Sequence, residues 1–167
     1  MLVSDAVLTF RELLDYSADE TARWERWFAE HPDALDLPYA DGQLATVRGV
    51  VHHVFVVERR HSERLLGRAV SGYGDVPSAP DAALFGAGRE ARTLLEDFLA
   101  AATDEELAGM LEFDTLSAGR QRASRRKLAA HILVHGIRHW AQLASHLRAL
   151  GRPTGWAHDL LMSRALV

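Results

Sequence analysis

The sequence contains no cysteine. Disulfides, thiolate zinc sites and a cysteine nucleophile are therefore excluded, so any metal must be held by histidine, carboxylate or water, and thiol chemistry needs an external thiol. A surplus of basic residues is also absent, because 19 lysines and arginines stand against 23 acidic residues, for a formal net charge of −4. This balance argues against nucleic acid as the main partner.

Long hydrophobic runs are missing as well. No apolar run approaches the length that crosses a membrane, and the first ten residues carry Asp5 and no basic segment of the kind that opens a signal peptide. We therefore expect a protein that has no membrane partner and lies in the cytoplasm. The length of 167 residues and the apolar content of 48% favour one domain over residues 1–167.

Hydrophobic periodicity predicts four long helices. We expect them from a cap at Ser4 to His31-Pro32, from about Gln43 to Ala69, from about Asp81 to Ala102, and from a cap at Ser124 to Leu150. The turn-rich segment 71–80 is long enough for a crossover connection. With no convincing sheet, these helices predict an all-α four-helix bundle, a fold that places metal sites in its core.

Four shorter segments complete the predicted fold. Thr103 can cap a short helical turn, and residues 111–116 could form a brief extended segment. Residues 117–123 are expected to form a mobile loop. Residues 156–166 are expected to form a tail helix that packs Leu160 and Leu161 on the bundle.

Histidines recur every fourth residue in the last predicted helix, at His131, His135 and His139. An α-helix returns to nearly the same face after four residues, so His135 and His139 lie one turn apart and could grip one metal ion. The same stripe holds Leu128 and Ile132. Because histidine is costly to bury without a partner, a metal is the simplest explanation for this row.

The second predicted helix offers a third ligand. Its periodicity places His53 beside the apolar seam and His52 on the polar face. His53, His135 and His139 would make an open three-histidine site, and imidazole ligands suit zinc, nickel, iron or copper without choosing among them. Glu58 and His61 lie near the seam and could support the ligands, shuttle protons or add a fourth ligand, although a buried hydrogen bond or a place on the helix surface is favoured for both.

Other candidates have plainer interpretations. His131 and His146 are more often structural, Gln142 could bond a histidine or a water or simply pack, and Trp24 and Trp27 are expected in the core. The basic run over residues 120–127 could grip an anionic substrate, although a solvated loop is favoured. Glu58-Arg-Arg-His61 supplies one di-iron motif without a second, and His-Glu-x-x-His is absent, as are phosphate-binding and dinucleotide-binding motifs.

With these motifs the sequence resembles the DinB-like superfamily. The family's last long helix reads His-x3-His-x2-His-His-Arg-Gly-Gln or a variant, which matches four positions here: His131, His135, His139 and Gln142. Arg138 stands for the optional extra histidine, and Trp140-Ala141 replaces the family's Arg-Gly. On the second helix the family shows a histidine followed five residues later by glutamate, as His53 and Glu58 do here.

The resemblance implies an up-down-down-up bundle, often a homodimer, with one divalent metal on His53, His135 and His139. The superfamily includes metal-dependent transferases and isomerases that use low-molecular-weight thiols. One hypothesis is therefore an enzyme, a thiol S-transferase or a hydrolase with a small-molecule substrate, in which Glu58 or His61 shuttles protons. The alternative is a non-catalytic, stress-related metal-binding or scaffold protein, whose metal site would be closed by a fourth protein ligand.

Overall fold

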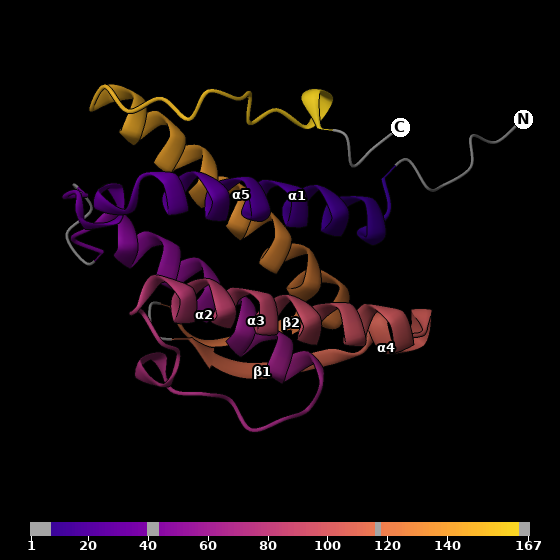
Figure 1. Ribbon diagram of the computed structural model, residues 1–167. Coiled ribbons are helices and arrows are strands. Elements are labelled where there is room, and N and C mark those ends of the chain that lie inside the picture. The colour runs from indigo at the N-terminus through magenta and orange to yellow at the C-terminus, as the bar shows by residue number, and fades with distance from the viewer. Residues whose placement is uncertain (1–7, 40–43, 116–117, 164–167) are drawn as a thin grey trace, which may run out of the picture.

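Four long helices dominate the computed structural model, which describes residues 8–39, 44–115 and 118–163 (Figure 1). They are α1 (Phe10–Glu30), α2 (Val47–Leu65), α3 (Asp81–Ala101) and α5 (Arg125–Ala149). The predicted all-α class is confirmed, since within these residues only one small sheet accompanies the helices. The up-down-down-up order stays a prediction. None of the described helices combines the length and the apolar character needed to span a bilayer.

Side-chain caps explain where the first two long helices begin. Thr9 and Glu12 form a reciprocal capping box at the start of α1, and the predicted cap Ser4 lies outside the described residues. α1 ends at Glu30, before Pro32, as predicted. α2 is shorter than predicted, because the Thr46 side chain accepts from the Gly49 amide at its start and Gly67, with φ of 66°, stops it after Leu65.

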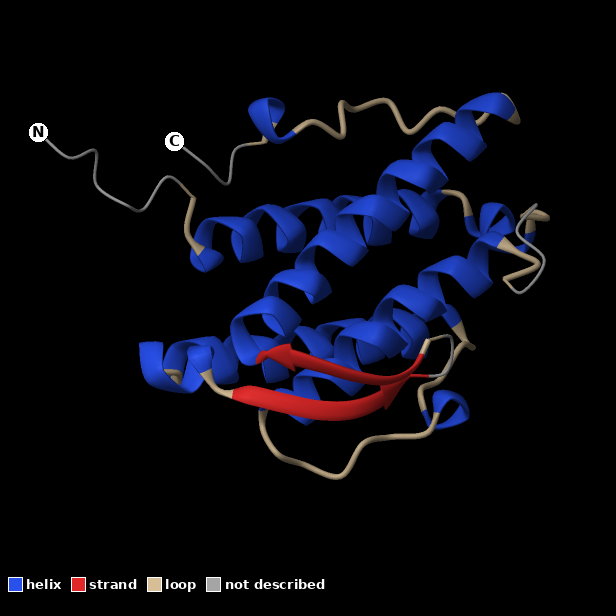
Figure 2. Cartoon of the chain, turned by 180° about the vertical axis from the view of Figure 1, so that it is seen from behind, coloured by secondary structure: helices blue, strands red, loops and turns tan. Residues whose placement is uncertain are grey.

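A β-hairpin lies between α4 (Asp104–Ala108) and α5. Thr103 caps α4 as predicted. Strands β1 (Met110–Thr115) and β2 (Gly119–Ser124) pair antiparallel, with Met110 opposite Ser124 and Thr115 opposite Gly119. The expected extended segment is confirmed over 111–115, whereas the expected absence of a sheet and the loop over 119–123 are wrong. Leu116 and Ser117 lie outside the described residues. Figure 2 shows the hairpin on the outside of the helices.

The tail after α5 is not the predicted helix. Its described part, up to Ser163, is irregular and holds a single 3-10 turn, η3 (Leu160–Met162). Leu161 is 84% exposed, so its predicted packing on the bundle is wrong. Polar contacts fasten this tail instead, because the Tyr16 hydroxyl of α1 donates to the carbonyl of His158 at 3.0 Å.

The buried side chains form two large apolar clusters separated by polar residues. One cluster contains Trp24, Phe55, Leu84 and Trp140, and the other contains Leu14, Leu65, Leu95 and Leu133. Trp24 and Trp27 are buried in the first cluster, as predicted. Along each long helix, one polar residue stands between the residues of the two clusters: Ser17, Glu58, Arg92 and His135, here called the polar layer.

Candidate metal centre

Three histidines meet in this polar layer. His53 projects from α2, and His135 and His139 project from consecutive turns of α5. The Nε2 atom of His135 lies 3.2 Å from Nε2 of His53 and 3.1 Å from Nε2 of His139. One nitrogen from each ring falls within 4.8 Å of the others. The structure therefore brings together the three residues that the sequence pattern singled out.

The spacing of these nitrogens fits a metal ion. Ligand nitrogens held at about 2.0–2.1 Å from one tetrahedral metal lie about 3.3 Å from each other. The two Nε2 separations of 3.2 and 3.1 Å are close to that value. Two of the three nitrogen pairs thus have the separation that a tetrahedral metal requires, and the group could hold one ion.

Burial keeps His53 and His135 in the form that binds metals. It lowers the pKa of His135 to about 2, and the neighbouring imidazoles and Arg138 act in the same direction. The pKa of His53 is also lowered, first by burial and then by the charges of Arg138 and His52. Because a metal ligand must be the neutral imidazole, these shifts favour coordination at neutral pH.

His52 does not lie on a polar face, so that prediction is wrong. Its side chain is buried, and its Nε2 lies 2.8 Å from the carbonyl oxygen of Val76. The connection between α2 and α3 covers this side of α2, which periodicity within one helix could not foresee. The same connection places Tyr73 edge-on against His52 and at 6.4 Å, ring to ring, from His53.

Glu58 lies in the polar layer but outside the three-histidine group. Its carboxylate is 2.7 Å from Nε of Arg92, and Arg92 also donates to the Ser17 hydroxyl at 2.9 Å and to the carbonyl of Leu14 at 3.3 Å. Burial raises the pKa of Glu58 even though Arg92 acts in the opposite direction. This network joins α1, α2 and α3, so in this structure Glu58 is engaged away from the histidines.

His61 approaches the candidate centre only through His131. The His61 and His131 rings are 5.5 Å apart, and His131 is 5.4 Å from His135. Burial, with Arg64 and His131, lowers the pKa of His61 to about 3. The rings of His53, His61, His131, His135 and His139 thus form a histidine row that runs from the three-histidine group toward Phe113 of the hairpin.

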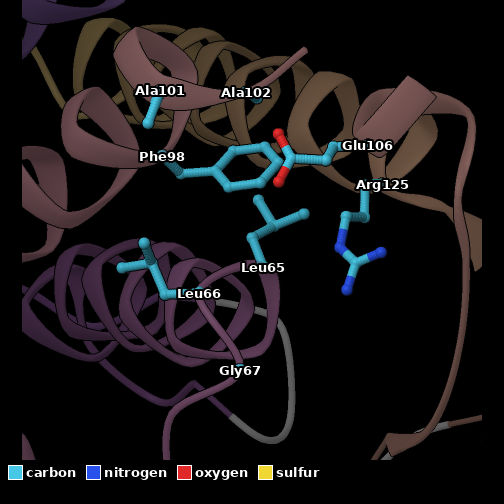
Figure 3. A pocket seen from close by; sticks show the side chains of 8 residues that line it. All are labelled: Leu65, Leu66, Gly67, Phe98, Ala101, Ala102, Glu106 and Arg125. Atoms are coloured by element: carbon cyan, nitrogen blue, oxygen red, sulfur yellow. The ribbon is translucent and has the colours of Figure 1, made fainter. Parts of the chain in front are cut away.

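The remaining candidates lie away from the group. Gln142 is exposed, and Nε2 of His146 lies 2.8 Å from the carbonyl oxygen of Pro38. In the basic run, Arg120 pairs with Glu112 at 2.6 Å and Arg126 with Asp104 at 3.1 Å, both on the surface. A separate pocket of about 390 Å³ is lined by Leu65, Leu66 and Phe98, with Glu106 and Arg125 on one side (Figure 3), and no histidine lines it.

Sequence reasoning underrated one residue at the centre. Arg138, noted only as the replacement for a family histidine, brings its Nη2 atom to 3.4 Å from Nε2 of His139. Its position directly before a predicted ligand was the available signal.

A mostly helical fold with three imidazoles converging in its interior defines a class of helical proteins with a candidate metal centre. A model of the DinB family matches residues 1–165, and the chain belongs to this family. A search among curated proteins finds no match.

Proposed function

We propose that this chain binds one divalent transition metal, such as zinc, nickel or iron, through His53, His135 and His139. The observation that carries the proposal is the convergence of three Nε2 atoms, two pairs of which are 3.2 and 3.1 Å apart. The low pKa values of His53 and His135, both caused mainly by burial, support neutral ligands. Membership of the DinB family, whose members bind metals, supports it independently.

The proposed activity is a transferase reaction with a small external thiol, or a hydrolysis. A divalent metal acts as a Lewis acid and lowers the pKa of a bound thiol or water toward neutrality. Three protein ligands leave a coordination position for such a group. Since the chain has no cysteine, the thiol comes from a co-substrate. His61 is connected to the group through the His131 ring, and the role of Glu58 or His61 in proton transfer stays a prediction.

The alternative, a scaffold with a structural metal, requires a closed site. A structural zinc normally has four protein ligands. Among the described residues the group contains three, and Glu58, the nearest acidic candidate from the sequence pattern, is held by Arg92. We therefore prefer the enzyme. The predicted homodimer, the small-molecule substrate and the cytoplasmic location stay predictions.

Metal content tests the proposal directly. Untagged protein is loaded with zinc, nickel or iron, desalted and analysed by mass spectrometry, together with His53→Ala, His135→Ala and His139→Ala. We expect about one metal per chain in the wild type and a large loss in each variant, since every ligand removed opens the site.

His146→Ala is the matched control, because His146 lies on the same helix but contacts the carbonyl oxygen of Pro38. It should retain the metal, and all variants should keep the helical circular dichroism of the wild type. A wild type that stays metal-free after loading, or three variants that all retain full metal, would contradict the proposal.

A further inference from the structure

Arg138 places a positive charge beside the three-histidine group. It directly precedes His139 on α5, and its Nη2 atom is 3.4 Å from the His139 Nε2 atom, the nitrogen that faces His135. Its charge also acts on His53, His131 and His135, in each case lowering the pKa. The guanidinium therefore lies on the side of the group toward which the ring nitrogens point.

This charge has no acidic partner in the part of the chain that the structure describes. Several arginines here pair with a carboxylate, as Arg48 does with Asp81 and Arg92 with Glu58, and others, such as Arg64, bond a backbone carbonyl. Arg138 forms no such ion pair among the described residues, and its one hydrogen-bond contact is a histidine ring nitrogen. Its side chain is exposed, so it can reach a molecule that enters from solvent.

A lone guanidinium next to a metal site is electrostatically unfavourable. Two cations that lie a few ångströms apart repel each other, and the repulsion grows as water is excluded. An anion placed between them removes this repulsion. The planar fork of arginine suits a carboxylate in particular, because it can donate two parallel hydrogen bonds.

We propose that Arg138 recognises a carboxylate of the substrate or co-substrate bound at the three-histidine centre, so that this site selects small anionic molecules over neutral ones of the same shape. The inference rests on the proposed metal site. Arg138 acts here as a specificity residue that orients the anion, while the histidines hold the metal.

The test uses protein loaded with cobalt(II), whose visible absorption reports ligand binding. Mercaptopropionate, an anionic thiol, and mercaptopropanol, its neutral counterpart, are titrated into the wild type and Arg138→Gln. The ratio of the two Kd values measures the preference for the anion. We expect the preference to fall about three- to tenfold in Arg138→Gln, the size of a charge-assisted contact at a partly exposed site.

Two further variants sharpen the test. Arg138→Lys should retain part of the preference, since it keeps the charge and loses the fork. Arg148→Gln removes another exposed arginine of α5 and should leave the preference unchanged. In the absence of thiol, Arg138→Gln should also bind cobalt more tightly than the wild type, because a repulsive charge is gone.

The outcomes separate the two proposals. If the wild type binds about one cobalt per chain but Arg138→Gln keeps the same anion preference, the role of Arg138 is overturned and the metal site stands. If the wild type binds no cobalt, the metal site fails and the inference fails with it. If Arg148→Gln lowers the preference as much as Arg138→Gln, the effect is one of general surface charge, and the assignment to Arg138 is wrong.

Discussion

Each imidazole of the histidine row is governed by its own surroundings. His61 is 8% exposed and lies against Phe113 and His131, so a proton on its ring would lose hydration without gaining an acidic partner among the residues that the structure describes. Arg64, whose Nη1 atom is 3.4 Å from the His61 Nδ1 atom, adds a repulsive charge. Burial is nevertheless the largest cause of the lowered pKa.

The lowered pKa of His61 makes the free energy of unfolding depend on pH. The pKa of His61 falls from 6.5 to about 3 on folding. Between these values the unfolded chain binds a proton that the folded chain does not. The folded state therefore loses free energy of unfolding as the pH falls below 6.5, by up to about 1.4 kcal/mol per pH unit for one such group.

His61→Gln removes this contribution. We expect the free energy of unfolding of the metal-free variant to depend less steeply on pH below 6.5 than that of the wild type, whatever the difference between them at neutral pH. Urea denaturation from about pH 7.5 to about pH 5.5 measures both slopes. Parallel slopes would show that His61 is not held neutral.

For single residues, the sequence predicted the site correctly where the spacing along a helix alone determines which side chains lie together. His135 and His139 are fixed one turn apart by the helix, and the seam of the second helix selected His53. The partners of Glu58 were out of reach, because Arg92 and Ser17 lie on other helices and nothing in a single helical pattern pairs them. Arg138 was noted only as the residue that replaces a family histidine, because its contact with the His139 ring depends on the conformation of its side chain.

Among the elements, α2 and α3 pack with unusually little space at one position. A Cβ atom on Gly88 of α3 would lie 2.6–2.7 Å from ring atoms of Phe55 on α2. Both residues are buried, so the ring has little freedom to move aside. Glycine at this position sets how closely the two helices approach.

Gly88→Ala should therefore destabilise the protein by about 1–2 kcal/mol, because overpacking exceeds the gain in helix propensity. Gly86→Ala is the matched control on the same helix, since its Cβ would meet only the Arg89 side chain at 3.8 Å. We expect it to be neutral or stabilising by up to about 1 kcal/mol. Urea denaturation compares the two, and equal effects would mean that the contact with Phe55 does not limit the packing.

The hairpin shows why one element escaped prediction. β2 is largely exposed and carries Arg120, Gln121 and Arg122, so no alternation of apolar and polar residues marks it as a strand. Backbone pairing with β1 and the contact of Arg64 with the hairpin hold it in place. Arg64 donates from Nη2 to the carbonyl of Asp114 at 3.1 Å and lies over the Phe113 ring. These contacts link distant segments, which local periodicity does not encode.

On the scale of the whole molecule, the tail is joined to α1 by one buried carboxylate. Glu20 is 3% exposed and accepts hydrogen bonds from Nε1 of Trp24 at 3.0 Å and Nε1 of Trp156 at 3.3 Å. His158 also contacts Glu20 through its Nδ1 atom. The tail is thus fastened by polar groups, whereas the sequence pattern suggested leucine packing.

Glu20→Ala leaves these three nitrogen donors without their acceptor. We expect a loss of about 3 kcal/mol or more in the free energy of unfolding, because each buried donor left without its acceptor costs about 1–3 kcal/mol. Glu25→Ala is the control on α1. It removes a surface pair with Arg89 of α3 and should cost about 1 kcal/mol or less. Limited proteolysis should also cut the tail of Glu20→Ala faster. Similar losses for the two variants would show that the buried network does not fasten the tail.

All four tryptophans of the chain gather around one ring. Trp24 lies 6.0 Å from Trp27, and 5.4 Å from both Trp140 and Trp156, measured between ring centroids. Trp140 directly follows His139, and Trp156 belongs to the tail. The intrinsic fluorescence of this protein therefore arises from a single group of coupled emitters. The fluorescence intensity should drop when a paramagnetic ion binds next to Trp140. The emission spectrum should shift to the red when the tail leaves α1, so a single fluorescence experiment without an added dye can follow both events.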